Sequence, residues 1–232
     1  MIFLSIFLLS LVQGFAEFLP ISSSGHLVLL HQLVALPGVD TLSFDIALHW
    51  GTLLALVIAF WPDILHLLAG WWRSLRTRSV QENPDGRLAW LLILGTIPAV
   101  IVGEIITMTV GEDSIRQPWV VVAALAVGGI VLLFADRFGR HDRTIQDVTV
   151  RDALLIGTFQ TLAFIPGISR SGATIITALL LSLKREAAVR FAFLLSIPVI
   201  LLAGIKQLLD LAGSHPPSGA IKAMTLGAVL TA

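Results

Sequence analysis

Two short polar motifs interrupt an otherwise apolar sequence, and both contain residue types that bind and cleave phosphate esters. The first places a carboxylate, three serines and a histidine between Gln13 and His26. The second places an arginine between two serines, within the segment from Pro166 to Thr174. Carboxylates accept protons or hold divalent cations, activated hydroxyls attack phosphorus, and guanidinium groups bind phosphate oxygens bidentately. The motifs therefore predict a phosphate-handling site.

Glu17 is an ionisable residue inside an apolar segment, four positions after Gln13 and hence on the same helical face. A charge at the centre of a membrane helix costs about 2.5–3.5 kcal/mol on insertion scales, so function is its default interpretation. The alternative is a carboxylate near the membrane interface that hydrogen-bonds to neighbouring serines. We expect Glu17 to bind a cation or accept a proton, with Gln13 as a second candidate cation ligand.

Arg170 lies in a turn before a predicted helix, where free backbone N–H groups add to the donors of its guanidinium. It would neutralise the equatorial oxygens of a phosphoryl group as the P–O bond breaks. The first turn offers similar donors and the titratable imidazole of His26. For any single serine taken alone, N-capping is the more ordinary role. The residues expected to contact substrate are Ser22, Ser24, Gly25, Gly167, Ser169, Ser171, Gly172 and Thr174.

A few other ionisable residues also lie in apolar segments. Asp45 and His49 share a helical face, and Glu104 is expected to be buried deep in another segment. Each is also consistent with a purely structural hydrogen bond. The Asp136–Arg137 pair is expected to be an interfacial ion pair at the end of a span. The chain has no cysteine, which excludes disulfides and thiolate chemistry.

The composition predicts that the motifs lie within a membrane. Hydrophobic residues make up 56% of the 232-residue chain, charged residues only 13%, and the mean hydropathy is +0.91. An ordinary soluble domain has about 25% charged residues. The formal net charge is zero, so no basic field indicates a nucleic-acid partner. The apolar N-terminus lacks a basic region and a cleavage site, so we expect it to belong to the mature fold.

Several apolar runs are long enough to cross a bilayer, which needs about 20 residues. They are residues 44–68, 88–110, 118–135 and 187–209, with a further run that begins near residue 219 and reaches the end of the sequence. We therefore expect an all-α polytopic membrane protein that forms a single integral membrane domain over residues 1–232.

Shorter apolar arms flank the two motifs, at residues 1–19 and 27–36 and at residues 152–165 and 173–183. At about 1.5 Å per residue, arms of about 10–14 residues are too short for a ~30 Å hydrocarbon core. Each pair is predicted to be a re-entrant helical hairpin. Non-helical backbone at that depth is tolerated only where protein buries it or where it lines a wet cavity.

An internal repeat relates the two hairpins, because a shift of 147 positions superimposes polar and glycine residues. The matched pairs are Gln13 with Gln160, Ala16 with Ala163, Ile21 with Ile168, Ser22 with Ser169, Ser24 with Ser171, and Gly25 with Gly172. We place repeat 1 at about residues 1–135 and repeat 2 at about residues 152–232, shortened at its C-terminal end. Inverted repeats of this kind place binding sites near the midplane.

The basic residues predict the orientation. They concentrate in loops 73–87 and 136–151, whereas residues 37–43 contain no lysine or arginine. With the basic loops in the cytoplasm, the first hairpin enters from outside and the second from inside.

At these residues the sequence closely resembles the undecaprenyl-diphosphate phosphatase family, also called the bacitracin-resistance phosphatases. The family's (E/Q)xxxE motif corresponds to Gln13–Glu17, its Pro-Ile-Ser-Ser-(Ser/Thr)-Gly-His turn to Pro20–His26, and its PGxSRSxxT motif to Pro166–Thr174. Residues 184–188 and 191–198 also resemble the family, so the resemblance covers nearly the whole chain. Gln13 stands where the family often has glutamate, and the chain ends before the family's final spans.

The resemblance implies a bacterial inner-membrane hydrolase that removes the terminal phosphate of undecaprenyl diphosphate and returns the monophosphate carrier to cell-wall synthesis. It implies an active site at the outer face of the membrane and a divalent cation, Mg²⁺ or Ca²⁺. By position, Glu17 is the metal or base carboxylate, Ser23 the candidate nucleophile, His26 an acid or base, and Arg170 the diphosphate clamp. Whether Ser23, His26 or water attacks stays open.

The expected partners are a polyprenyl diphosphate lipid, the surrounding membrane lipids and a second copy of the chain in a homodimer. The main alternative is a polyprenyl-phosphate lipid transporter, because opposed hairpins are typical of transporters. A channel is disfavoured, since the polar groups cluster at two points rather than along a continuous path.

Overall fold

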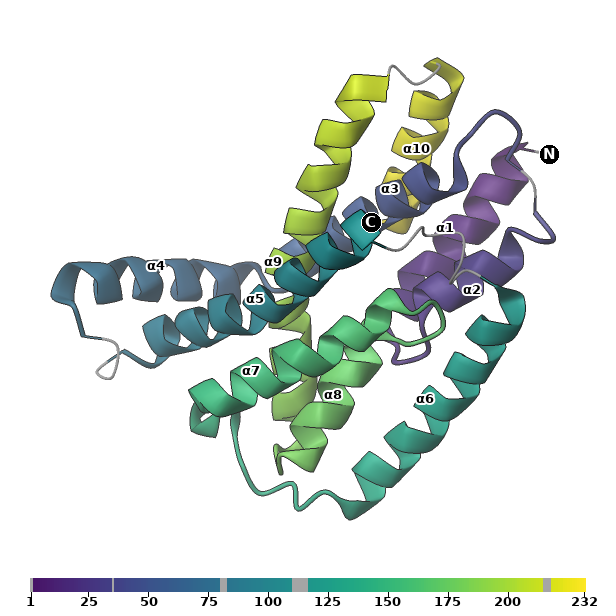
Figure 1. Ribbon diagram of the computed structural model, residues 1–232. Coiled ribbons are helices and arrows are strands. Elements are labelled where there is room, and N and C mark those ends of the chain that lie inside the picture. Colours follow the sequence, from purple (N-terminus) through teal and green to yellow (C-terminus); the bar gives the residue numbers. More distant parts are fainter. Residues whose placement is uncertain (1, 35, 80–82, 110–116, 215–217) are drawn as a thin grey trace.

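The computed structural model describes residues 2–34, 36–79, 83–109, 117–214 and 218–232, and the helices and 3-10 turns make up all of its named elements (Figure 1). The expected all-α class is confirmed within these ranges. The elements are α1 (Ile2–Phe18), α2 (Ser23–Leu30), α3 (Thr41–Ala59), α4 (Trp61–Thr77), α5 (Pro84–Thr109), α6 (Pro118–Phe138), η2 (Ile145–Asp147), α7 (Val150–Phe159), η3 (Gln160–Phe164), α8 (Arg170–Leu180), α9 (Arg185–Ser214) and α10 (Ser218–Thr231).

Four of the described helices are long and apolar enough to cross a membrane, in α3, α5, α6 and α9. Three of them coincide with the predicted runs 88–110, 118–135 and 187–209. The outer face of α6 presents large apolar side chains such as Val127 and Leu133, as contact with lipid requires. The chain is therefore a multi-pass membrane protein.

The predicted span 44–68 is wrong as a single helix, because the structure divides it into α3 and α4 at Phe60. Pro62 has no backbone N–H, and its ring would clash with the carbonyl of Ile58 in a continuous helix. The second helix, α4, continues to Thr77 and lies beside α5 (Figure 1).

The segments around the two motifs are helix–turn–helix units, α1–α2 and α7–η3–α8, but the inner helices begin earlier than predicted. The arm expected at 27–36 is α2, which begins at Ser23 and ends at Leu30. The arm expected at 173–183 is α8, which begins at Arg170. The candidate nucleophile and the candidate clamp are therefore first-turn helical residues. Partial entry of these hairpins into the membrane stays a prediction.

Two apolar clusters hold the motif-bearing helices against the longer ones. One joins α7, α8 and α9 through Ile156, Leu179 and Phe191, which are all at most 1% exposed. The other joins α1, α3 and α10 around Leu9 and Phe44, both fully buried. Because α9 also packs against α3 and α5, it connects the cluster of α7 and α8 with the helices around α3. The same helix forms one wall of a cavity beside the two motifs.

Candidate active site

The two turns, far apart in sequence, contact each other through their glycines. A Cβ atom added to Gly25 would lie 2.9 Å from the Cα of Gly167. Gly167 has a φ of +100°, and a Cβ there would lie 2.5 Å from the carbonyl oxygen of Val121 in α6. Both positions therefore require the absence of a side chain. The two polar motifs of the sequence therefore meet in the structure.

The same capping hydrogen bonds occur in both turns, at positions 147 residues apart. The hydroxyl of Ser22 accepts from the N–H of Gly25 at 3.3 Å, and that of Ser169 accepts from the N–H of Gly172 at 3.0 Å. A hydroxyl pair accompanies each cap, Ser22 with Ser24 at 3.3 Å and Ser169 with Ser171 at 3.0 Å. The local repeat is thus visible in the hydrogen bonds. The ordinary role of Ser22 and Ser169, N-capping, is also confirmed.

One difference between the turns is the backbone at Ser22. This residue has φ 66° and ψ 92°, whereas Ser169 is extended with φ −72°. A positive φ is uncommon for a residue with a side chain and persists where the surroundings enforce it. The next residue, Ser23, faces Glu17 and donates a hydrogen bond to it.

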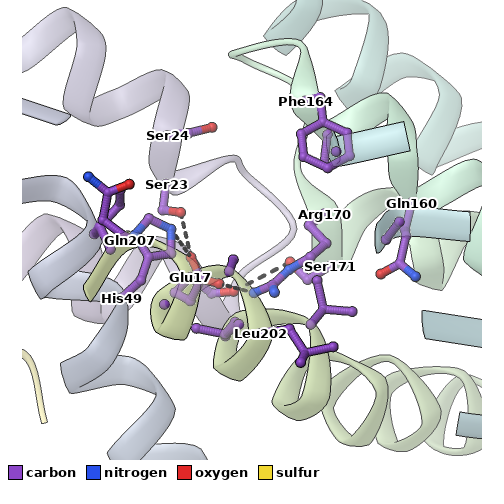
Figure 2. A pocket seen from close by; sticks show the side chains of 18 of the residues that line it. Glu17, Ser23, Ser24, His49, Gln160, Phe164, Arg170, Ser171, Leu202 and Gln207 are labelled. Atoms are coloured by element: carbon purple, nitrogen blue, oxygen red, sulfur yellow. Dashed lines mark hydrogen bonds and ion pairs between the residues drawn. The ribbon is translucent and has the colours of Figure 1, made fainter. Parts of the chain in front are cut away.

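Glu17 is the centre of the site, at the C-terminal end of α1 and with its side chain 7% exposed. Its Oε1 forms an ion pair with the guanidinium of Arg170. Its Oε2 accepts hydrogen bonds from the hydroxyl of Ser23 at 2.6 Å and from the amide of Gln13 at 3.1 Å. The Nε2 of His49 lies 3.5 Å from the same oxygen. Figure 2 shows Glu17 between Ser23 and His49 on one side and Arg170 on the other.

This arrangement has the parts of an activated nucleophile. A hydroxyl donates to a carboxylate that is itself held in place by other groups, as in nucleophile–base pairs generally. Ser23 and Arg170 each occupy the first turn of a helix, where unpaired N–H groups and the helix dipole favour an anion. The constellation of Glu17, Ser23 and Arg170 is suited to phosphoryl transfer.

A cavity of about 490 Å³ opens beside these groups. At its polar end lie Glu17, Ser23 and Arg170, together with the serines of both turns. Its other walls are mainly apolar and come from α3, α5, η3 and α9, including Val100, Phe164 and Leu202. A largely apolar cavity with a few convergent polar groups fits an amphiphilic ligand with a charged head.

Other predicted site residues lie behind the turns rather than in the cavity wall. The residues in this group are Gln13, Gly25, His26, Gly167, Gly172 and Thr174. His26 Nδ1 lies 2.8 Å from the carbonyl oxygen of Ser22, within its own turn. The hydroxyl of Thr174 donates to the carbonyl oxygens of Arg170 and Ser171 at 3.0 and 2.9 Å. These residues shape the turns that hold the cavity-lining groups.

His49 belongs to the site, although the sequence pointed only weakly to it. In the sequence, the only indication was that His49 shares a helical face with Asp45. In the structure, these two side chains have different partners. Asp45 Oδ1 lies 2.8 Å from Nε2 of His31, whereas His49 reaches Glu17. The Nδ1 of His49 lies 2.7 Å from the carbonyl oxygen of Asp45, so this ring faces oxygen atoms on both sides. The expectation that Glu104 is buried deep in its segment is wrong, because its side chain is 48% exposed.

The donor set limits how a divalent cation fits. Across the described residues, no group of three or more His, Asp or Glu side chains is arranged to hold a metal. Glu17 supplies one carboxylate, and beside it Gln13 has a buried side-chain oxygen without a hydrogen-bond partner. Mg²⁺ is commonly held by one or two carboxylates together with substrate phosphates and water. The Glu17 carboxylate, which lines the cavity, fits a cation of that kind bound mainly through a phosphate ligand, and the Gln13 oxygen lies buried beside it.

Comparisons with known proteins agree with the motifs. The sequence model of a family described as bacitracin resistance protein BacA matches residues 6–232. The undecaprenyl-diphosphatase of Nitrosococcus oceani is 42% identical over 99% of this chain and 84% of its own length. That of Renibacterium salmoninarum is 39% identical over 91% of this chain and 75% of its own length. That of Anaeromyxobacter sp. is 46% identical, covering 84% and 64% of the two chains.

The glycine contact between the turns gives a test of the site's architecture. Gly25→Ala places a methyl group 2.9 Å from the Cα of Gly167, so we expect a loss of stability of about 1–3 kcal/mol. The matched control is Gly128→Ala in α6, where a Cβ would meet no atom within 4 Å. Thermal unfolding in detergent measures both variants. Equal melting temperatures for Gly25→Ala and the control would show that the turns are not in tight contact.

Proposed function

Because this chain belongs to the family of bacitracin resistance protein BacA, we propose that it is a membrane-embedded undecaprenyl-diphosphatase. It removes the terminal phosphate of undecaprenyl diphosphate and releases undecaprenyl phosphate for reuse as a cell-wall lipid carrier. The names of the relatives support this reaction. The observation that carries it is the contact of Glu17 with both Ser23 and Arg170 at the polar end of an apolar cavity.

In the proposed mechanism Ser23 is the nucleophile and Glu17 is its base. The Ser23 oxygen attacks the terminal phosphorus while its proton passes to Glu17 Oε2, 2.6 Å away. The bond from that phosphorus to the bridging oxygen breaks, and undecaprenyl phosphate leaves after taking the proton from Glu17. A water then attacks the phosphoserine and gives its proton to Glu17. The bond from phosphorus to the Ser23 oxygen breaks, that oxygen takes the proton back from Glu17, and inorganic phosphate leaves.

Arg170 has two roles in this scheme. Before substrate binds, its guanidinium neutralises Glu17. A diphosphate competes for the same donors, and a guanidinium has five N–H groups in a planar fork, enough to serve both anions. As Arg170 shares its N–H groups with the phosphate, its ion pair with Glu17 Oε1 weakens and the carboxylate becomes a better proton acceptor. Substrate binding and activation of the base are thereby coupled.

The two histidines take different positions in this scheme. His49 faces the same carboxylate oxygen as Ser23 and holds it in orientation. His26 lies behind the turn, so we assign it to the support of Ser22 rather than to proton transfer with substrate.

A divalent cation, Mg²⁺ or Ca²⁺, is part of the proposal. Glu17 would hold it together with the substrate's phosphates, and the unpartnered oxygen of Gln13, buried beside Glu17, is the second candidate ligand. Such a cation supplies charge neutralisation at the phosphate oxygens. We also propose a bacterial inner-membrane location with the cavity reached from the outer face, a topology supported by the basic loops 73–87 and 136–151.

Phosphate release from farnesyl diphosphate or undecaprenyl diphosphate by the purified protein in detergent tests the reaction. We expect Ser23→Ala to reduce turnover on the order of 10³-fold or more, because the attacking oxygen is lost. Thr225→Ala, which removes an exposed hydroxyl on α10 outside the cavity, is the control and should keep the wild-type rate.

Two other results would change the proposed mechanism or the proposed function. A small loss in Ser23→Ala would mean that water attacks and that Ser23 only donates a hydrogen bond. If the wild-type protein released no phosphate but moved polyprenyl phosphate across vesicle membranes, the transporter alternative would replace the hydrolase.

The pair Gln13 and Glu17 tests the cation. We expect Glu17→Gln to eliminate activity, since it removes the carboxylate that is both base and ligand. Gln13→Glu should retain activity and reach half-maximal rate at a lower Mg²⁺ concentration, because a second negative charge strengthens cation binding. The measurement is rate against Mg²⁺ and Ca²⁺ concentration. An unchanged cation dependence in Gln13→Glu would argue that this face of α1 does not meet the metal.

A further inference from the structure

A second ion pair lines the same cavity as Glu17 and Arg170. Glu104 of α5 pairs with Lys206 of α9, and both side chains are among those that line the cavity. The two side chains are 48% and 43% exposed, whereas those of Glu17 and Arg170 are 7% and 19% exposed. The Glu104–Lys206 pair therefore lies at the open side of the cavity, and the Glu17–Arg170 pair at its buried side.

The charges around the cavity are balanced before substrate arrives. Within the described part of the chain, the Asp, Glu, Lys and Arg side chains that line the cavity are Glu17, Glu104, Arg170 and Lys206, and His49 lines it as well. Their formal charges sum to zero. A phosphate group carries about −1.5 to −2 charge near pH 7, so a diphosphate brings a large negative charge into this space. At least one basic side chain must change its partner, or cations must enter with the ligand.

The outer pair is the easier one to exchange. The Glu17 carboxylate is fixed by Ser23 and Gln13 as well as by Arg170, whereas the Glu104–Lys206 pair joins two half-exposed side chains. Exposed ion pairs contribute little net stability, and a lysine carries its charge on a flexible four-carbon chain. Lys206 can therefore leave Glu104 at small cost when a stronger anion enters the cavity.

We propose that Lys206 is a second phosphate-binding residue, which receives the substrate's diphosphate at the cavity mouth, and that Glu104 holds Lys206 until the substrate displaces it. This assignment rests on the proposed function, because it identifies the ligand as the diphosphate group. Glu104 competes with the anion for Lys206, so it weakens binding of both substrate and released phosphate. The polyprenyl chain then has the apolar walls of α5 and α9 beside it.

A purely structural role for the pair makes a different prediction. If Glu104 and Lys206 only join α5 to α9, then removing either charge breaks the same contact and has the same consequence. If Lys206 binds phosphate and Glu104 competes with it, the two substitutions act in opposite directions on affinity. The sign of the change therefore separates the two roles, even when both variants lose equal stability.

The experiment compares Lys206→Gln with Glu104→Gln in detergent with Mg²⁺ present, using farnesyl diphosphate for kinetics and inorganic pyrophosphate for calorimetric binding. We expect Lys206→Gln to raise KM about tenfold, equivalent to about 1.4 kcal/mol, and to weaken pyrophosphate binding similarly. We expect Glu104→Gln to lower KM about threefold and to tighten pyrophosphate binding. Melting temperatures should fall equally in the two variants.

Matched controls are Lys222→Gln on α10 and Glu186→Gln on α9, exposed residues that do not line the cavity, and both should keep wild-type KM. Equal rises in KM for Glu104→Gln and Lys206→Gln, or an unchanged KM in Lys206→Gln, would overturn the inference. If the wild-type protein hydrolysed nothing, the proposed reaction would fail by itself. Pyrophosphate binding in the same variants would still decide whether Lys206 is an anion ligand.

Discussion

A carboxylate and a guanidinium that are both withdrawn from water stabilise each other only when they are in direct contact. Glu17 and Arg170 form such a contact although they are 153 positions apart in the sequence. Removing either partner would leave an uncompensated charge in an apolar surrounding, which is strongly unfavourable. This pair therefore forces the end of α1 and the start of α8 together. The close contact of Gly25 with Gly167 and the packing of α6 on both turns follow from that approach.

The same constraint explains why the site is suited to an anionic substrate. Each polar group around Glu17 has a structural partner before substrate binds: Ser23 and Gln13 donate to its oxygens, and Arg170 neutralises it. A phosphate that competes for Arg170 disturbs this balance and leaves the carboxylate with greater affinity for the proton of Ser23. The apolar walls contributed by α5 and α9 lie beside the region where the charge changes.

Much of this arrangement could be predicted from the sequence, because its strongest signals are local. The spacing of Gln13 and Glu17 placed both on one helical face, and the polar turns stood out against apolar arms. Three of the long helices also followed from run length alone. The internal repeat identified turns that share the same capping hydrogen bonds.

What the sequence did not reveal depends on side-chain direction and on contacts between distant helices. The break between α3 and α4 was signalled by Pro62, but hydropathy averaged over a window conceals a single proline. His49 reaches Glu17 only because α3 packs against α1, and Glu104 is half exposed because its helix borders the cavity. His26 and Thr174 belong to conspicuous motifs, yet their hydrogen bonds turn back into their own segments.

The central claim is that the planar guanidinium of Arg170, and not merely its charge, joins Glu17 to the substrate's phosphate. The most direct test is the rate of phosphate release from farnesyl diphosphate by Arg170→Lys, with thermal unfolding as the measure of folding. We expect Arg170→Lys to stay folded and to lose about 10²-fold in kcat/KM, because an ammonium cannot bind both anions bidentately. Wild-type turnover in Arg170→Lys would contradict the account.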